Sequence, residues 1–167
     1  MKSLKFLSFF IVALLFSASA NADIFTNKHG VAIRGYDPVA YFEQSKPTKG
    51  KKSISVKHDN GATYRFSSEA NRDLFVANPS NYLPQYGGYC AFGVAMAVQK
   101  FATDPKAWSI VDGKLYLNLN PKVQKRWKTD VPGFIRGSEN NWPLIVSIPQ
   151  KDLAKGKRPA GVTVGPQ

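Results

Sequence analysis

The sequence predicts a small single α+β domain in which two β-hairpins pack against several short helices. Two segments carry strand-like patterns on both sides of strong turn residues, at 54–66 and 109–117. Residues typical of helix N-termini occur between these two segments and after the second one. The chain has 167 residues, of which 43% are hydrophobic and 20% charged, values typical of a globular chain of one domain. A disordered chain and a bundle of membrane-spanning helices are therefore excluded.

The N-terminus has the features of a cleaved secretory signal peptide covering residues 1–22. Lys2 and Lys5 precede an apolar run at 6–16, which is interrupted only by Ser8 and is too short to cross a bilayer of about 30 Å. Small residues at Ala20 and Ala22 fit an A-x-A cleavage site. We therefore expect an exported protein, periplasmic or secreted, with no transmembrane segment in its mature form.

The elements of the mature chain follow from local signals. Asp37-Pro38 predicts a short helix over 38–43, and Ser67-Ser68 followed by Pro79 bounds a helix from Glu69 to about Ala77. The hairpins are expected to turn at 59–61 and 112–113, and Asn120-Pro121 opens a further helix.

Two less regular regions complete the expected fold. A helix is predicted over 87–99, because no turn residue follows Gly93 there. A segment at 131–148 is expected to wrap the domain. The folded domain is thus expected over 23–148, and residues 149–167 are expected to form a flexible basic tail.

The net charge of +12 could reflect binding to nucleic acid, contact with an anionic surface or a solvated protein surface. The basic residues are scattered and no nucleic-acid-binding motif accompanies them, so nucleic acid is not an expected partner. Solvated surface is the default interpretation, and weak contact with an anionic envelope surface is the alternative.

The segment at 84–95 contains Cys90, the single cysteine, among glycines and tyrosines. A helix beginning near Gly87 would place Cys90 in its first turn, where free N–H groups favour the thiolate. Tyr86, one turn earlier, would share that face. A thiolate would ligate copper or zinc or act as a nucleophile, but a buried structural cysteine is the commoner role.

Other candidates are weaker. Met96 lies about 600° around the same helix from Cys90, so the two are expected on different faces. His58, at a strand end, is expected to be a satisfied polar residue more often than a ligand. The motifs G-x-S-x-G, H-E-x-x-H and the P-loop are absent from the sequence, so no classical catalytic set is found.

Several motifs together resemble the YHS-domain family, in its small exported single-domain form. The resemblance covers roughly residues 30–143 and rests on Gly35 to Phe42, His58 to Gly61, Tyr64 to Ser68, Asn78-Pro79, Pro84 to Ala95, Asp112 to Asn118 and Asn141 to Pro143. Tyr64, His58 and either Ser67 or Ser68 correspond to the residues that name the family.

The resemblance implies a domain that binds metal, with copper as one candidate, often through two cysteines. Ser67 and Asn71 occupy the corresponding positions here, so that pair of soft ligands is missing.

We therefore expect a non-enzymatic binding protein of the cell envelope. Its site would contain Cys90, Tyr86, Tyr89 and Tyr64 for a small ligand, or Cys90 and His58 for copper or zinc. The alternatives are a thiol-dependent redox factor or enzyme that uses Cys90, and an envelope interaction module.

Overall fold

The computed structural model describes residues 23–162, 164 and 165. Its described part contains six α-helices and two antiparallel two-stranded sheets, which confirms the predicted α+β class. No helix in this part is long and apolar enough to cross a membrane. The predicted signal peptide lies outside the described residues.

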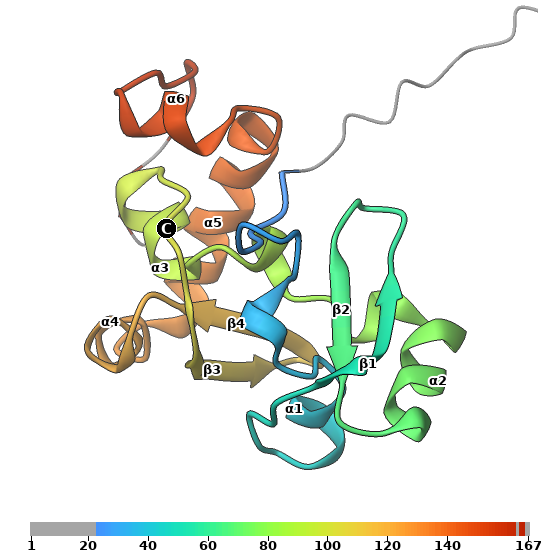
Figure 1. Ribbon diagram of the computed structural model, residues 1–167. Helices are drawn as coiled ribbons and strands as arrows, with labels where there is room; N and C mark the ends of the chain where they lie inside the picture. Colours follow the sequence, from blue (N-terminus) through green and yellow to red (C-terminus); the bar gives the residue numbers. More distant parts are fainter. Residues whose placement is uncertain (1–22, 163, 166–167) are drawn as a thin grey trace, which may run out of the picture.

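The first hairpin pairs β1 (Lys51–Lys57) with β2 (Thr63–Phe66), as the alternating pattern predicts. The helix α2 (Glu69–Ala77) begins after Ser68, whose hydroxyl accepts a hydrogen bond from the Asn71 N–H. In Figure 1, α2 lies beside this hairpin, and α1 (Ala40–Glu43) lies at the bottom of the view. Tyr64, Phe66 and Phe75 form the centre of one apolar core.

The second hairpin pairs β3 (Asp104–Val111) with β4 (Lys114–Asn118). Asp104-Pro105 resembles a helix start in sequence, but the structure places both residues in β3. The helix α4 (Pro121–Trp127) follows, and the Asn120 side chain caps its N-terminus by accepting from the Val123 N–H.

A second apolar core lies between α3 (Ala91–Ala97) and α5 (Val131–Ile145), two helices that pack side by side (Figure 1). The segment expected to wrap the domain is therefore a regular helix for most of its length. Ser138 and Asn141 of α5 are buried, and their side chains donate hydrogen bonds to the carbonyl oxygens of Ala91 and Val94.

The expected flexible tail from residue 149 onward is wrong in its first part. Gln150–Ala154 forms α6, and Leu153 is fully buried in the second core. The Gln99 amide donates to the Leu153 carbonyl oxygen at 2.7 Å. The composition of residues 149–167 does not predict α6, because one apolar side chain, Leu153, holds this helix against the core.

Lys100 connects the first described residue to the segment that follows α5. Its ammonium donates to the Asp23 carboxylate at 3.1 Å and to the carbonyl oxygens of Val146 and Ile148 at 2.8 and 2.7 Å. Burial lowers the pKa of Lys100, while the carboxylate of Asp23 opposes that shift.

Candidate functional site

Cys90 is the N-cap of α3, and this helix begins at Ala91 instead of near Gly87. The helix starts later than expected because of the backbone before Cys90. Tyr86, Gly87 and Gly88 have positive φ values of 54°, 60° and 79°, which a right-handed helix does not allow. Gly87 also needs its missing side chain, since a Cβ atom there would lie 2.6 Å from the Asp23 carbonyl oxygen.

The sulfur of Cys90 sits among polar groups although the residue is only 1% exposed. Its Sγ accepts hydrogen bonds from the Gly93 N–H at 3.4 Å and the Leu119 N–H at 3.3 Å. The thiol donates to Asn118 Oδ1 at 3.8 Å. These contacts hold the sulfur between the start of α3 and the end of β4.

The expected thiolate is wrong. Burial raises the pKa of the Cys90 thiol, and the N–H groups of Gly93 and Leu119 lower it by less than burial raises it. The predicted donors at the helix start are therefore present, but loss of water around the sulfur outweighs them. Cys90 is a neutral thiol at neutral pH.

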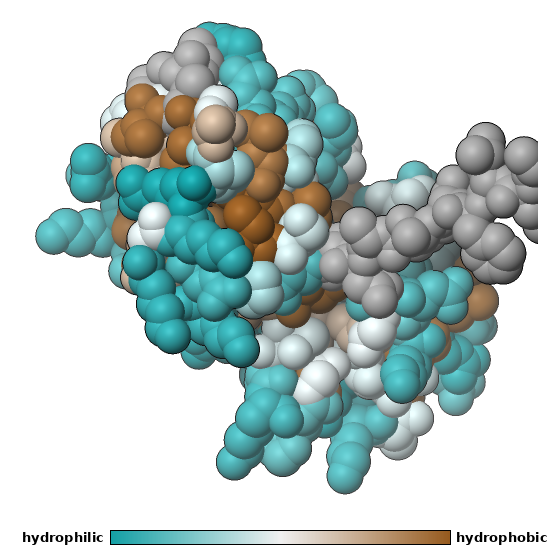
Figure 2. All heavy atoms as spheres, turned by 90° about the horizontal axis from the view of Figure 1, so that it is seen from above, coloured by the Kyte–Doolittle hydropathy of each residue, from teal (hydrophilic) through white to brown (hydrophobic). Residues whose placement is uncertain are grey.

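An apolar pocket of about 160 Å³ opens beside this thiol. Its other wall residues come from α3, from the segment after it, and from the chain at β4 and α4. They are Phe92, Gly93, Met96, Ala97, Phe101, Leu119 and Val123. Figure 2 shows hydrophobic side chains gathered on the side of the molecule that carries α3 and α6.

Met96 corrects a second expectation, because it lines the same pocket as Cys90. The expected angular separation of about 600° applies only to one continuous helix from residue 87. Cys90 instead lies at the cap with extended backbone, at φ −63° and ψ 112°, so the angular spacing does not apply. The structure thus brings the two sulfur-bearing side chains of this segment to one cavity.

Tyr86 and Tyr89 belong to an aromatic cluster and do not line the pocket. The Tyr86 ring packs against Tyr116 and Trp142, with centroids 5.9 Å apart in each pair. The Tyr89 ring lies 5.5 Å from Phe25, and the ammonium of Lys100 lies 5.6 Å from its centroid. Burial raises the pKa of both phenols, so they serve as core residues.

His58 and Tyr64 lie in the other core. The His58 ring packs edge-on against Tyr64 and Phe75, and its Nδ1 accepts from the Asn60 N–H at 3.1 Å. The Asn60 amide also donates to the Tyr64 hydroxyl at 3.0 Å, and burial raises the pKa of that phenol to about 12. Cys90 lies at the start of α3, and among the described residues no hydrogen bond or ring contact joins it to His58.

Within the described residues, no group of three or more His, Cys, Asp and Glu side chains could hold a metal ion. The positions that correspond to the two family cysteines are used differently. The Ser67 hydroxyl and the Asn71 amide both donate to Asp37 Oδ2, at 2.6 and 2.7 Å. Ser67 and Asn71 therefore do not fit a copper or zinc ion and instead satisfy a buried carboxylate.

Sequence reasoning missed most of the pocket residues. Leu119 and Val123 lie far from Cys90 in sequence, and the packing of α3 against β4 and α4 brings them beside it. Phe101, 40% exposed, resembles an ordinary surface residue. No local pattern indicates these contacts.

No protein-family model, curated protein or solved structure matches the chain. The resemblance to the YHS-domain family therefore stays a prediction.

Proposed function

We propose that this chain is a non-enzymatic binding protein of the cell envelope, and that it binds a small apolar ligand in the pocket beside Cys90. The observation that supports this proposal is the pocket itself, whose walls are apolar apart from one neutral thiol. A dry cavity of about 150 Å³ is large enough for benzene. The Cys90 pocket, at about 160 Å³, suits a ligand of similar size.

The state of the thiol favours binding over thiol chemistry. A nucleophilic or redox-active cysteine needs a lowered pKa and access to solvent. Cys90 has a raised pKa and is buried. In this proposal the Cys90 sulfur forms a polarisable part of the pocket wall. The redox alternative has no support from the state of this thiol.

A soft monovalent metal is a second candidate ligand, because Cys90 and Met96 line the same pocket. Thiolate and thioether sulfurs are the ligands that copper(I) prefers. Binding would require Cys90 to lose its proton, so copper(I) affinity would rise with pH. Zinc is a poorer candidate, since it favours four ligands drawn from Cys, His and carboxylates.

The proposed location rests on the N-terminal pattern. Cleavage after Ala22 would make Asp23 the first residue of the mature protein. We predict that protein recovered from outside the cytoplasm has the mass and N-terminal sequence of the chain from Asp23 onward. Recovery of the intact chain from the cytoplasm alone would contradict export.

A benzene titration followed by NMR tests the binding proposal. The Ala97→Leu variant fills the pocket with a larger side chain, while Ala70→Leu adds the same side chain on exposed α2. We expect saturable shifts around Cys90 in the native protein and Ala70→Leu, and none in Ala97→Leu. Equal benzene binding by all three proteins would overturn the proposal.

The metal candidate is tested separately by titrating copper(I) into the native protein, Cys90→Ser and Met96→Leu. Copper(I) binding that is lost in Cys90→Ser and weakened in Met96→Leu would support the metal candidate. Equal copper(I) binding by the three proteins would refute it.

A further inference from the structure

The outer face of the first hairpin is a different surface from the Cys90 pocket. Residues alternate along β2, so Tyr64 and Phe66 point into the core while Thr63 and Arg65 lie on the opposite face. Ser55 pairs with Arg65 across the hairpin. On the other side of β2, Val31 forms a bridge with Thr63.

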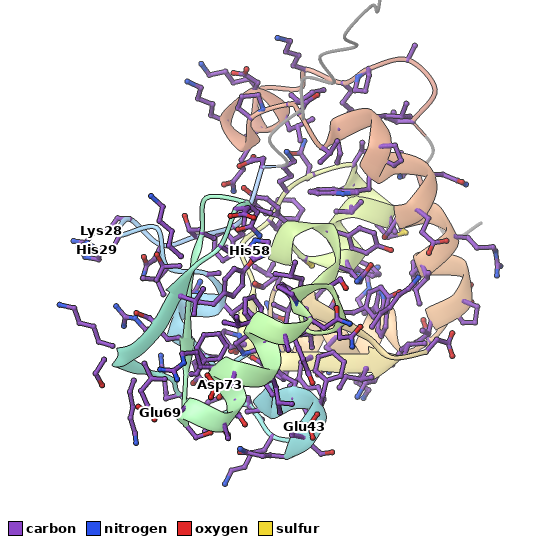
Figure 3. All side chains as sticks on the ribbon, turned by 90° about the vertical axis from the view of Figure 1, so that its right-hand side faces the viewer. Lys28, His29, Glu43, His58, Glu69 and Asp73 are labelled. Atoms are coloured by element: carbon purple, nitrogen blue, oxygen red, sulfur yellow. The ribbon has the colours of Figure 1, made fainter. Side chains whose placement is uncertain are left out.

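A second pocket, of about 500 Å³, lies on this face. Its walls contain three basic residues and two hydroxyl residues, together with Val31, and no carboxylate. The polar wall residues are His29, Lys52, Arg65, Ser55 and Thr63. Figure 3 shows His29 and Lys28 projecting from the edge of the molecule, away from the labelled acidic residues of α1 and α2.

The positive charge of this pocket is not neutralised within the described part of the chain. The two ion pairs found there are Arg72–Asp73 and Lys100–Asp23, and neither includes a residue of the pocket. The Thr63 hydroxyl has no hydrogen-bond partner among the described residues, and the Ser55 hydroxyl donates to the Lys52 carbonyl oxygen at 3.2 Å. The pocket therefore presents cations and a free hydroxyl without a counterion.

The side chain of Arg65 packs against the backbone of Gly35. A Cβ atom added at Gly35 would lie 3.5 Å from Arg65 Cδ and 3.6 Å from Arg65 Nη1, so the arginine side chain passes directly over this glycine. Gly35 has a φ of +78°, a conformation that other residues rarely adopt. The stem of Arg65 is thus half-buried, which reduces the entropy lost when its guanidinium binds a ligand.

We propose that this pocket binds a phosphate group. Arginine offers two parallel N–H donors to a phosphate, and lysine adds a compact charge. The free Thr63 hydroxyl donates to a remaining phosphate oxygen, and the absence of a carboxylate from the pocket walls removes the main source of repulsion. The phosphate belongs either to a soluble molecule or to a lipid headgroup, since both present the same chemistry.

The experiment titrates inorganic phosphate into the purified protein against sodium chloride of equal ionic strength, with NMR detection. Arg65→Gln removes the principal donor, and the matched control Arg158→Gln removes the same charge from an exposed site beyond α6. We expect saturable shifts around Thr63 and Arg65, at least tenfold weaker phosphate binding in Arg65→Gln, and unchanged binding in Arg158→Gln.

A second arm separates the two sources of phosphate. Vesicles of phosphatidylglycerol are compared with phosphatidylcholine vesicles, and inorganic phosphate is added as a competitor. Arg65-dependent, phosphate-sensitive binding to phosphatidylglycerol indicates a lipid headgroup, whereas inorganic phosphate binding without vesicle binding indicates a soluble ligand. Failure of both arms, or equal losses in Arg65→Gln and Arg158→Gln, would overturn the proposal and leave the Cys90 pocket untouched.

Discussion

The thiol of Cys90 experiences two opposed electrostatic effects. Backbone N–H groups from α3 and from the segment after β4 point at the sulfur and stabilise its anion, while burial removes the water that an anion needs. Burial has the larger effect, so the folded protein holds the proton more tightly than the unfolded chain does.

This raised pKa predicts a loss of stability in alkali. The contribution from Cys90 is complete below the ordinary thiol pKa of 9.0 and is lost as the pH rises through the folded value. Urea unfolding at rising pH should show the free energy of unfolding decreasing above about pH 9. The Cys90→Ala variant should lack this component, and identical pH profiles for both proteins would refute it.

Asp37 is a fully buried carboxylate whose two oxygens both accept hydrogen bonds. Its Oδ1 accepts from the N–H groups of Val39 and Ala40, and its Oδ2 accepts from Ser67 and Asn71. The carboxylate thus joins the start of α1 to the start of α2.

We expect Asp37→Ala to lower the free energy of unfolding by about 3–5 kcal/mol, because it leaves several buried donors without an acceptor. Asp73→Ala, at an exposed ion pair on α2, should change stability by less than about 1 kcal/mol. Urea denaturation measures both. A small effect of Asp37→Ala would mean that water replaces the carboxylate.

At the scale of elements, local sequence signals predicted the parts that depend on neighbouring residues. Ser68 and Asn120 cap the helices expected after them, and Asp112-Gly113 turns the second hairpin as predicted. The start of α3 was not predictable, because Tyr86 has a positive φ that sequence patterns seldom reveal. The sequence predicts Cys90 as a site residue, but the pocket beside it depends on contacts with residues that are remote in sequence.

The helix α6 shows why the expected tail was wrong. Its few residues have no strong helical pattern, and the burial of Leu153 against the second core is what fixes them. Isolated segments of this length do not form stable helices in water.

We therefore predict that Leu153→Ala lowers the free energy of unfolding by about 2–4 kcal/mol, as for other buried leucines. Leu144→Ala on α5, where the side chain is 37% exposed, serves as the control and should cost much less. Equal effects in thermal or urea unfolding would mean that α6 is not docked as described.

At the scale of the whole molecule, one apolar core lies against both hairpins and a second lies between α3 and α5, and one candidate pocket lies near each core. The Cys90 pocket belongs to the α3 side and is apolar. The hairpin pocket is basic and carries part of the net charge of +12. Under the two proposals above, the protein binds an apolar ligand at one pocket and a phosphate group at the other.

The central claim is that the pocket beside Cys90 is the ligand-binding site. The most direct test is the measurement of intermolecular NOEs between bound benzene and the protein. We predict NOEs from benzene to the methyl groups of Met96 and Ala97, and their loss in Ala97→Leu. NOEs to exposed Val164 or Leu144 alone, or no NOEs at all, would contradict it.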